Sequence, residues 1–160
     1  MKVILIEDQK LLSSTLARAL QQSGDIEVAA ISDKATDALE LCRKHDPEAV
    51  IMDVFTREGN GIEYTARLKK AFPRIKVLLM TGVEDGRLVQ EAEKAGADLF
   101  VWKDLPLEDL LDFIRNAKKP YRVFPDIYTA EQRQSQFSDT DIRILQLLAR
   151  GRSSREIAEE

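Results

Sequence analysis

The sequence predicts an α/β fold, a doubly wound parallel sheet of five strands with helices on both faces. Five short apolar runs alternate with five stretches of helical spacing between residue 3 and about residue 117. The third run, residues 49–52, is continuously apolar and leads directly into Asp53. Such a run is typical of a strand buried on both faces of a parallel sheet. Strict alternation at this spacing favours right-handed βαβ units.

The expected strands are rich in β-branched and other apolar residues. They cover residues 3–6, 26–31, 49–52, 75–80 and 98–102. The first helix is indicated by apolar residues at helical spacing, namely Leu11, Leu12, Leu16, Ala19 and Leu20. It ends at Ser23-Gly24, where glycine stops the helical pattern.

Each later helix has a stop or start signal. The second is lined by Ala35, Ala38, Leu39 and Cys42. It ends before Asp46-Pro47, because a residue before proline disfavours the α conformation. The third covers residues 62–72 and is closed by Pro73, and the fourth covers about residues 85–95 with Gly96 as its stop. The fifth opens at Pro106 and runs to about residue 117.

Length and composition fit one well-buried domain plus a further fragment. The chain has 160 residues, of which 44% are hydrophobic and 32% charged. Its net charge of -4 gives no general reason to expect nucleic-acid binding by the whole chain. Cys42 is the single cysteine, so no intrachain disulfide forms and a reducing compartment fits. No signal peptide and no apolar run of roughly 20 residues is evident, so we expect a cytoplasmic protein with no membrane partner.

Polar residues gather where the expected strands end. Glu7 and Asp8 follow the first strand, Asp53 the third, Thr81 the fourth and Lys103 the fifth. Because parallel strands end at one edge of the sheet, these side chains are expected to converge there. Close carboxylates repel unless a cation neutralises them, and oxygen-only ligands suit Mg²⁺. Asp53 is then a candidate nucleophile toward phosphorus, with the metal and Lys103 balancing the phosphoryl oxygens.

These strand-end residues resemble the receiver domain of bacterial two-component response regulators over about residues 1–118. The residues that carry the resemblance are Glu7-Asp8, Asp53, Thr81-Gly82, Phe100 and Lys103. The resemblance implies a flavodoxin-like (CheY-like) five-stranded parallel sheet of order 2-1-3-4-5. It also implies that Asp53 is the phosphorylation site and accepts its phosphoryl group from a sensor histidine kinase.

The same resemblance implies a magnesium site. Asp8, Asp53 and the main-chain carbonyl of Phe55 would bind Mg²⁺ directly, and Glu7 would act mainly through water. The chain would catalyse only its own phosphorylation and a slow self-dephosphorylation, so it is not expected to be an enzyme in the usual sense.

A conformational switch is implied as well. Lys103 would pair with the phosphate, Thr81 would swing toward it, and Phe100 would rotate inward and remodel the nearby surface. The first and fifth helices are the face that the resemblance suggests for a possible homodimer.

The loop after the phosphorylation site departs from the family pattern. An apolar residue and then Pro-Gly are usual there, whereas this chain has Thr56-Arg57-Glu58, with Asn60 where Asp is common and Gly61 retained. Loop geometry and kinase choice are expected to differ accordingly. Phe55 and Val83 stand two residues after the phosphorylation site and Thr81, at positions that the resemblance implies govern a water's access to the acyl phosphate, and neither apolar side chain can orient an attacking water. We therefore expect slow loss of the phosphoryl group.

Beyond residue 118 the composition changes. Residues 119–137 contain two prolines and a glutamine-rich run, which predicts a linker with a short helix in its second half. Residues 138–160 resemble the opening of a LuxR-type helix-turn-helix domain, with Ser138 as the N-cap of its first helix. A receiver followed by this domain implies a transcriptional regulator of the NarL/FixJ type.

Binding to DNA is expected only of the full-length protein. The recognition helix of such a domain reads the major groove, and in this layout it lies beyond Glu160. Residues 139–160 carry four arginines against five acidic residues, which is not a basic DNA-binding face.

Two alternatives remain from the sequence. One is a receiver that acts through protein–protein contacts without DNA output. The other is a phosphatase-type α/β enzyme that uses Asp53 as nucleophile. Such an enzyme typically has an aspartate two residues further on, where this chain has Phe55.

Overall fold

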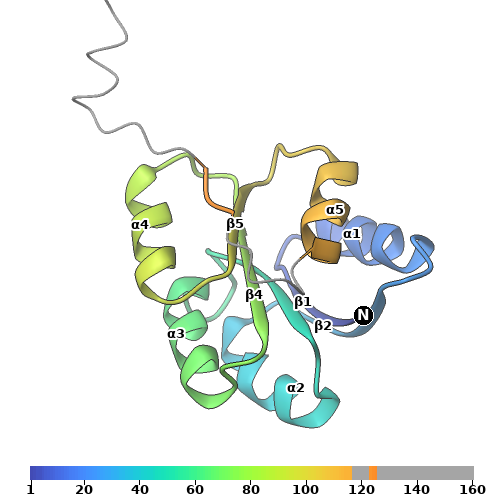
Figure 1. Ribbon diagram of the computed structural model, residues 1–160, viewed down its shortest axis with the longest axis horizontal. Coiled ribbons are helices and arrows are strands. Elements are labelled where there is room, and N and C mark those ends of the chain that lie inside the picture. Colours follow the sequence, from blue (N-terminus) through green and yellow to red (C-terminus); the bar gives the residue numbers. More distant parts are fainter. Residues whose placement is uncertain (117–122, 126–160) are drawn as a thin grey trace, which may run out of the picture. The chain divides into compact units, whose positions relative to one another are not determined.

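The computed structural model describes residues 1–116 and 123–125 of the chain (Figure 1). The strands in this part are β1 (Lys2–Ile6), β2 (Glu27–Ser32), β3 (Ala49–Asp53), β4 (Lys76–Thr81) and β5 (Leu99–Trp102). The helices are α1 (Lys10–Gln22), the 3₁₀ turn η1 (Ala35–Asp37), α2 (Ala38–His45), α3 (Gly61–Ala71), α4 (Gly86–Lys94) and α5 (Leu107–Asn116).

The strands form one parallel sheet of order β2-β1-β3-β4-β5, which confirms the predicted fold and strand order. In its register Ile6 pairs with Met52, and Asp53 pairs with Met80. Helices α1 and α5 lie on one face of the sheet and α2, α3 and α4 on the other (Figure 1). Strand β3 is therefore central, and Asp53 lies at the carboxyl edge between the ends of β1 and β4.

The core explains why β3 has no polar residue before its end. Every residue of β3 is buried, because helices cover both of its faces. On the α1/α5 side, side chains of β1, β3, β4 and β5 pack against both helices. The larger members of this cluster include Leu5, Ile51, Leu78, Leu99, Leu16, Leu20, Leu110 and Ile114. Each fully buried side chain of this size stabilises the fold by about 1.5–3 kcal/mol.

Helix starts differ slightly from those expected. The second helix begins as the 3₁₀ turn η1, whose first N–H, that of Ala35, donates to the carbonyl oxygen of Glu58 in another loop. Helix α4 begins at Gly86, with Asp85 as its N-cap accepting from the N–H of Arg87 at 2.9 Å. Such caps satisfy amide groups that have no partner inside the helix.

Residues 123–125 extend the sheet by one contact. Val123 lies parallel to β5 opposite Leu99, with its carbonyl accepting from Phe100 N–H at 2.8 Å and its N–H donating to Asp98 O at 3.2 Å. Part of the segment expected to be a linker thus lies on the sheet edge. The expected boundaries at residues 118 and 137 stay predictions, and the helix-turn-helix fragment of residues 138–160 lies outside the described residues.

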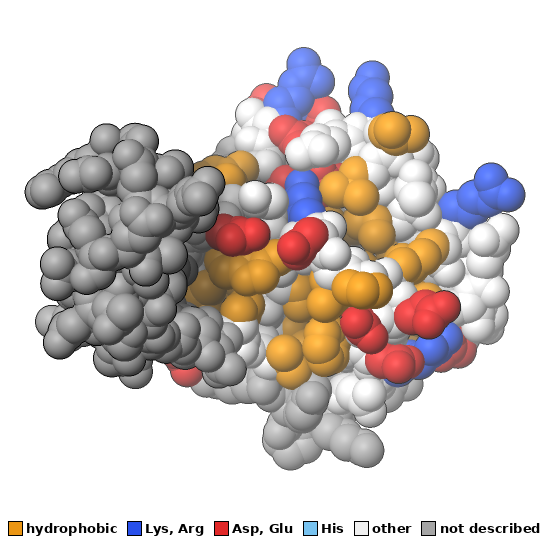
Figure 2. Space-filling model, turned by 90° about the horizontal axis from the view of Figure 1, so that it is seen from above, with side chains coloured by type: hydrophobic (Ala, Val, Ile, Leu, Met, Phe, Trp, Pro, Cys, Tyr) orange, Lys and Arg blue, Asp and Glu red, His pale blue; other side chains and the backbone are white. Residues whose placement is uncertain are grey.

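The surface carries several exposed apolar side chains. Figure 2 shows hydrophobic side chains gathered in the middle of one face, with acidic and basic groups around them. In the described part of the chain, the exposed large hydrophobic residues are Leu11, Ile31, Phe55, Val83 and Leu107. No helix among the described residues has the length and apolar character needed to cross a membrane.

Candidate functional site

The predicted site residues of three strand ends meet at the carboxyl edge. Asp53 is the last residue of β3, Glu7 follows the end of β1, and Lys103 follows the end of β5. Lys103 Nζ lies 2.6 Å from Asp53 Oδ2 and 3.0 Å from Glu7 Oε1. Both carboxylates are buried, so their pairing with this ammonium takes place largely away from water. The site is therefore a buried ionic cluster.

Asp8 completes an acidic cluster with Glu7 and Asp53. One carboxylate oxygen from each of the three residues lies within 4.8 Å of the others. Glu7 Oε2 is buried and accepts no hydrogen bond within the described residues, although Lys103 Nζ lies 2.9 Å from it as an ion pair. An oxygen-only donor set with one under-coordinated buried oxygen fits a hard divalent cation such as Mg²⁺.

Asp53 is held at both carboxylate oxygens. Its Oδ1 accepts a hydrogen bond from the N–H of Phe55 at 3.1 Å, and its Oδ2 faces Lys103. The turn after β3 therefore orients the carboxylate through the backbone, while Lys103 orients it through charge. A carboxylate fixed in this way can act as a metal ligand or as a nucleophile.

The electrostatics of the cluster are dominated by burial. Burial raises the pKa of Asp53, and hydrogen bonds from Lys103 and from the Phe55 amide offset only part of that shift. Burial likewise raises the pKa of Glu7 against the lowering effect of Lys103. Burial alone would lower the pKa of Lys103, but its bonds to Asp53 and Glu7 raise it, so the ammonium stays charged. The carboxylates thus favour a second cation nearby.

Neither of the predicted switch residues, Thr81 and Phe100, hydrogen-bonds to the Asp53 side chain within the part of the chain that the structure describes. Thr81 ends β4 and is buried, and its hydroxyl oxygen accepts a hydrogen bond from the N–H of Val83 at 3.2 Å. The Phe100 ring is fully buried and meets Trp102 edge-on, with centroids 5.2 Å apart and planes at 84°. The ring already points inward, and its rotation on activation stays a prediction.

The loop between β3 and α3 contains contacts that the sequence did not reveal. A Cβ added at Gly61 would lie 2.2 Å from the carbonyl oxygen of Asp53, so only glycine allows α3 to begin this close to the site. Thr56 accepts a hydrogen bond from the N–H of Ala35, in the loop after β2, at 3.0 Å. The departure from Pro-Gly at residues 56–58 was the only sequence signal for this contact.

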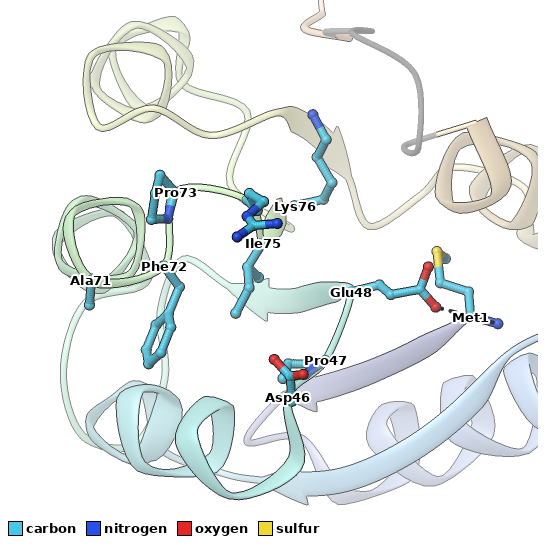
Figure 3. Close-up of a pocket in the computed structure, with 10 residues that line it drawn as sticks. Met1, Asp46, Pro47, Glu48, Ala71, Phe72, Pro73, Ile75 and Lys76 are labelled. Atoms are coloured by element: carbon cyan, nitrogen blue, oxygen red, sulfur yellow. Dashed lines mark ion pairs between the residues drawn. The ribbon is translucent and has the colours of Figure 1, made fainter.

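A pocket lies at the opposite edge of the sheet, away from the acidic cluster (Figure 3). Its volume is about 650 Å³, and its lining includes residues just before β1, β3 and β4, namely Met1, Glu48 and Ile75. The ammonium of Met1 and the carboxylate of Glu48 form an ion pair there at 3.9 Å. None of the predicted site residues lines this pocket.

Known proteins show the same organisation. The pattern of the response regulator receiver domain matches residues 3–115. Response regulator protein VraR from Staphylococcus aureus is 26% identical, over 98% of this chain and 79% of its own length. A crystal structure of a DNA-binding response regulator of the LuxR family from Staphylococcus aureus matches with a TM-score of 0.70 at 27% identity, covering 74% of this chain and 98% of that one.

A second solved structure agrees. The signal receiver domain of the response regulator NarL from Mycobacterium tuberculosis matches with a TM-score of 0.70 at 25% identity, covering 73% of this chain and 94% of that one. The relatives are thus response regulators that include LuxR-family members, as the sequence resemblance suggested. The residues matched by the receiver pattern include all but the first residue of the five strands, and all three residues of the acidic cluster. The chain belongs to the response regulator receiver domain family.

Proposed function

We propose that the chain accepts a phosphoryl group on Asp53 from a sensor histidine kinase and acts as the receiver of a two-component response regulator. The observation that carries the proposal is the contact of 2.6 Å between Asp53 and Lys103 within the acidic cluster. A buried carboxylate beside a fixed ammonium combines a nucleophile with a group that can neutralise transferred charge. Membership of the receiver family supports the same function.

We assign Mg²⁺ as the cation of this site. Asp8, Asp53 and the main-chain carbonyl of Phe55 would hold the ion, with Glu7 acting through water. The oxygen-only donor set and the under-coordinated Glu7 Oε2 support this assignment. When bound, Mg²⁺ supplies charge neutralisation for the oxygens of the transferring phosphoryl group.

The transfer itself needs one bond exchange. A carboxylate oxygen of Asp53 attacks the phosphorus of the kinase's phosphohistidine, and the P–N bond breaks as the P–O bond forms. The imidazole nitrogen leaves with the electron pair and takes a proton from solvent. Lys103 keeps its proton and donates a hydrogen bond to a phosphoryl oxygen. The product is an acyl phosphate, so the chain carries the signal and does not turn over a separate substrate.

The switch follows from the added charge. The Thr81 hydroxyl releases the Val83 N–H and donates to a phosphoryl oxygen, and the Phe100 ring adjusts to the space that Thr81 leaves. The charge of the covalently bound phosphoryl group and the movements of Thr81 and Phe100 together bias an equilibrium between two conformations of the domain. Phosphorylation thereby controls conformation and a possible homodimer.

Exposed apolar side chains support a protein partner at this edge. Leu11, Phe55, Val83 and Leu107 lie in the segments that follow strands β1, β3, β4 and β5. Exposed apolar side chains beside charged groups are typical of protein interaction surfaces. We assign the kinase to this edge of the sheet, in the cytoplasm. In the full-length protein, transcription control through a LuxR-type DNA-binding domain would be the output.

The test is intact mass after incubation with a small phosphodonor and Mg²⁺. The wild-type chain is expected to gain one phosphoryl group, and Asp53→Ala is expected to gain none. Asp104→Ala is the matched control, because it removes an exposed aspartate one residue beyond Lys103. A gain that survives Asp53→Ala, or no gain in the wild type, would overturn the proposal.

A further inference from the structure

The loop after β3 is bound to the loop after β2 by a set of hydrogen bonds. The N–H of Arg57 donates to Asp33 O at 3.1 Å, and the N–H of Ala35 donates to Glu58 O at 2.9 Å. Thr56 stands where the family usually has an apolar residue and Arg57-Glu58 where it usually has Pro-Gly, and a proline at position 57 could not donate this N–H. The bond from the Arg57 N–H is therefore a feature of this chain's own sequence.

Thr56 is the centre of this contact. Its hydroxyl oxygen accepts from Ala35 N–H at 3.0 Å and lies 2.9 Å from each of the carbonyl oxygens of Glu58 and Gly59. A single hydroxyl group thus binds across the two loops and also closes its own loop. Valine has the same shape without the hydrogen-bonding group, so it would leave those backbone groups without this partner.

Two ion pairs border the contact but contribute less. Arg57 pairs with Asp33 at 3.1 Å and Lys34 pairs with Glu58 at 2.8 Å. All four side chains are at least one-third exposed, the least exposed being Lys34 at 34%. Exposed pairs of this kind are screened by solvent and stabilise little. The Thr56 hydroxyl and the backbone bonds therefore carry most of the connection.

The contact between the two loops is linked to the acidic cluster by the peptide unit between Phe55 and Thr56. The carbonyl of Phe55 and the N–H of Thr56 belong to the same planar peptide unit, so holding Thr56 in place limits how far that carbonyl can turn. On its other side, Phe55 is held by its N–H bond to Asp53 and by an isolated bridge to Asn60. The carbonyl assigned to Mg²⁺ is thus oriented from both ends.

We propose that Thr56 is a positioning residue that orients the Phe55 carbonyl for Mg²⁺ by tying it to the loop after β2. The proposal rests on the magnesium site of the proposed function. Without the hydrogen bonds of the Thr56 hydroxyl, the peptide unit between Phe55 and Thr56 could rotate more freely, and the ion would lose a preorganised ligand. Mg²⁺ affinity should therefore depend on the Thr56 hydroxyl even though Thr56 does not touch the ion.

The test is a Mg²⁺ titration of the 160-residue chain followed by the fluorescence of Trp102, its single tryptophan. Trp102 directly precedes Lys103, which contacts the cluster. Thr56→Val is expected to weaken Mg²⁺ binding by about three- to tenfold, the loss of roughly one net hydrogen bond. Thr56→Ser restores the hydroxyl and is expected to stay within about twofold of the wild type.

Thr36→Val is the matched control. Thr36 is exposed in the 3₁₀ turn η1, and its hydroxyl makes no hydrogen bond with the described residues, so Mg²⁺ affinity should not change. Thr56→Ala serves as a second hydroxyl-free variant, and circular dichroism identifies the temperature at which every variant is folded. Wild-type affinity in folded Thr56→Val and Thr56→Ala, or equal weakening in Thr56→Ser, overturns the positioning role alone. A wild-type chain that binds no Mg²⁺ overturns the magnesium site and this proposal together.

Discussion

Gly61 allows helix α3 to begin directly against the end of β3, and Gly61→Ala tests that arrangement. The backbone N–H of Gly61 donates to Val54 O at 2.8 Å. A Cβ at this position would lie 2.2 Å from Asp53 O and 3.1 Å from Val54 Cα. Backbone atoms cannot turn aside as a flexible side chain can, so the helix start must move.

The required movement sets the expected cost. Real Cβ contacts stay beyond 3.0 Å, so the separation must grow by at least 3.0 minus 2.2, or 0.8 Å. Overpacking of this kind costs about 1–3 kcal/mol of unfolding free energy. The displaced atoms belong to Asp53 and the residue after it, and a shift of about 1 Å at a reacting group can reduce the rate about 100-fold. Gly61→Ala should therefore lose stability and also slow phosphorylation.

Urea denaturation and the rate of phosphorylation from a small phosphodonor measure both effects. Gly82→Ala is the matched control, because a Cβ at Gly82 has nothing within 4 Å and its φ is not positive. It should unfold at the same or a slightly higher urea concentration than the wild type. Wild-type stability in Gly61→Ala, or an equal loss in Gly82→Ala, would refute the close-approach argument.

Three further outcomes are expected. Burial alone would raise the pKa of Asp98, but hydrogen bonds from Lys69 and Lys76 lower it below the ordinary value for aspartate. The ionised Asp98 carboxylate therefore stabilises the fold above that ordinary pKa, and this stabilisation disappears as the pH falls. Asp98→Asn should therefore cost about 3 kcal/mol near neutral pH, with a difference from wild type that shrinks in acid urea denaturation; a pH-independent difference would contradict this. Phe55→Asn should shorten the half-life of the acyl phosphate, measured by intact mass over time, because it adds a group that can orient water; an unchanged or longer half-life would contradict it. Asn60→Ala should cost about 1 kcal/mol in thermal unfolding, since Asn60 caps α3 by accepting from two amides, and an unchanged melting temperature would show that the cap is dispensable.

The sheet and the acidic edge were predictable because they depend on local patterns. Continuous apolar runs such as the one before Asp53 identify buried parallel strands, and parallel strands place their carboxyl ends together. The convergence of Glu7, Asp53 and Lys103 follows from that rule without knowledge of any distance. Strand order followed from the family resemblance rather than from the pattern, and the structure confirms it.

The contacts between loops were not predictable in the same way. The hydrogen bond from the Ala35 N–H to the Thr56 hydroxyl joins segments 21 residues apart, and no sequence periodicity reports the relative position of two loops. The bond from the Ala35 amide to Glu58 at the start of the second helix likewise joins two segments that no local pattern relates. The pairing of Val123 with β5 was missed because a single bridge leaves no repeating pattern.

The most direct test of the central claim is to locate the phosphoryl group chemically. Borohydride reduces a carboxyl group that is activated as an acyl phosphate and leaves ordinary carboxylates unchanged. After phosphorylation with Mg²⁺ and a small phosphodonor, peptide mass spectrometry should find homoserine at position 53 and at no other aspartate. Reduction at a different aspartate, or no reduced residue in a chain whose mass shows phosphorylation, would contradict the assignment of Asp53 as the acceptor.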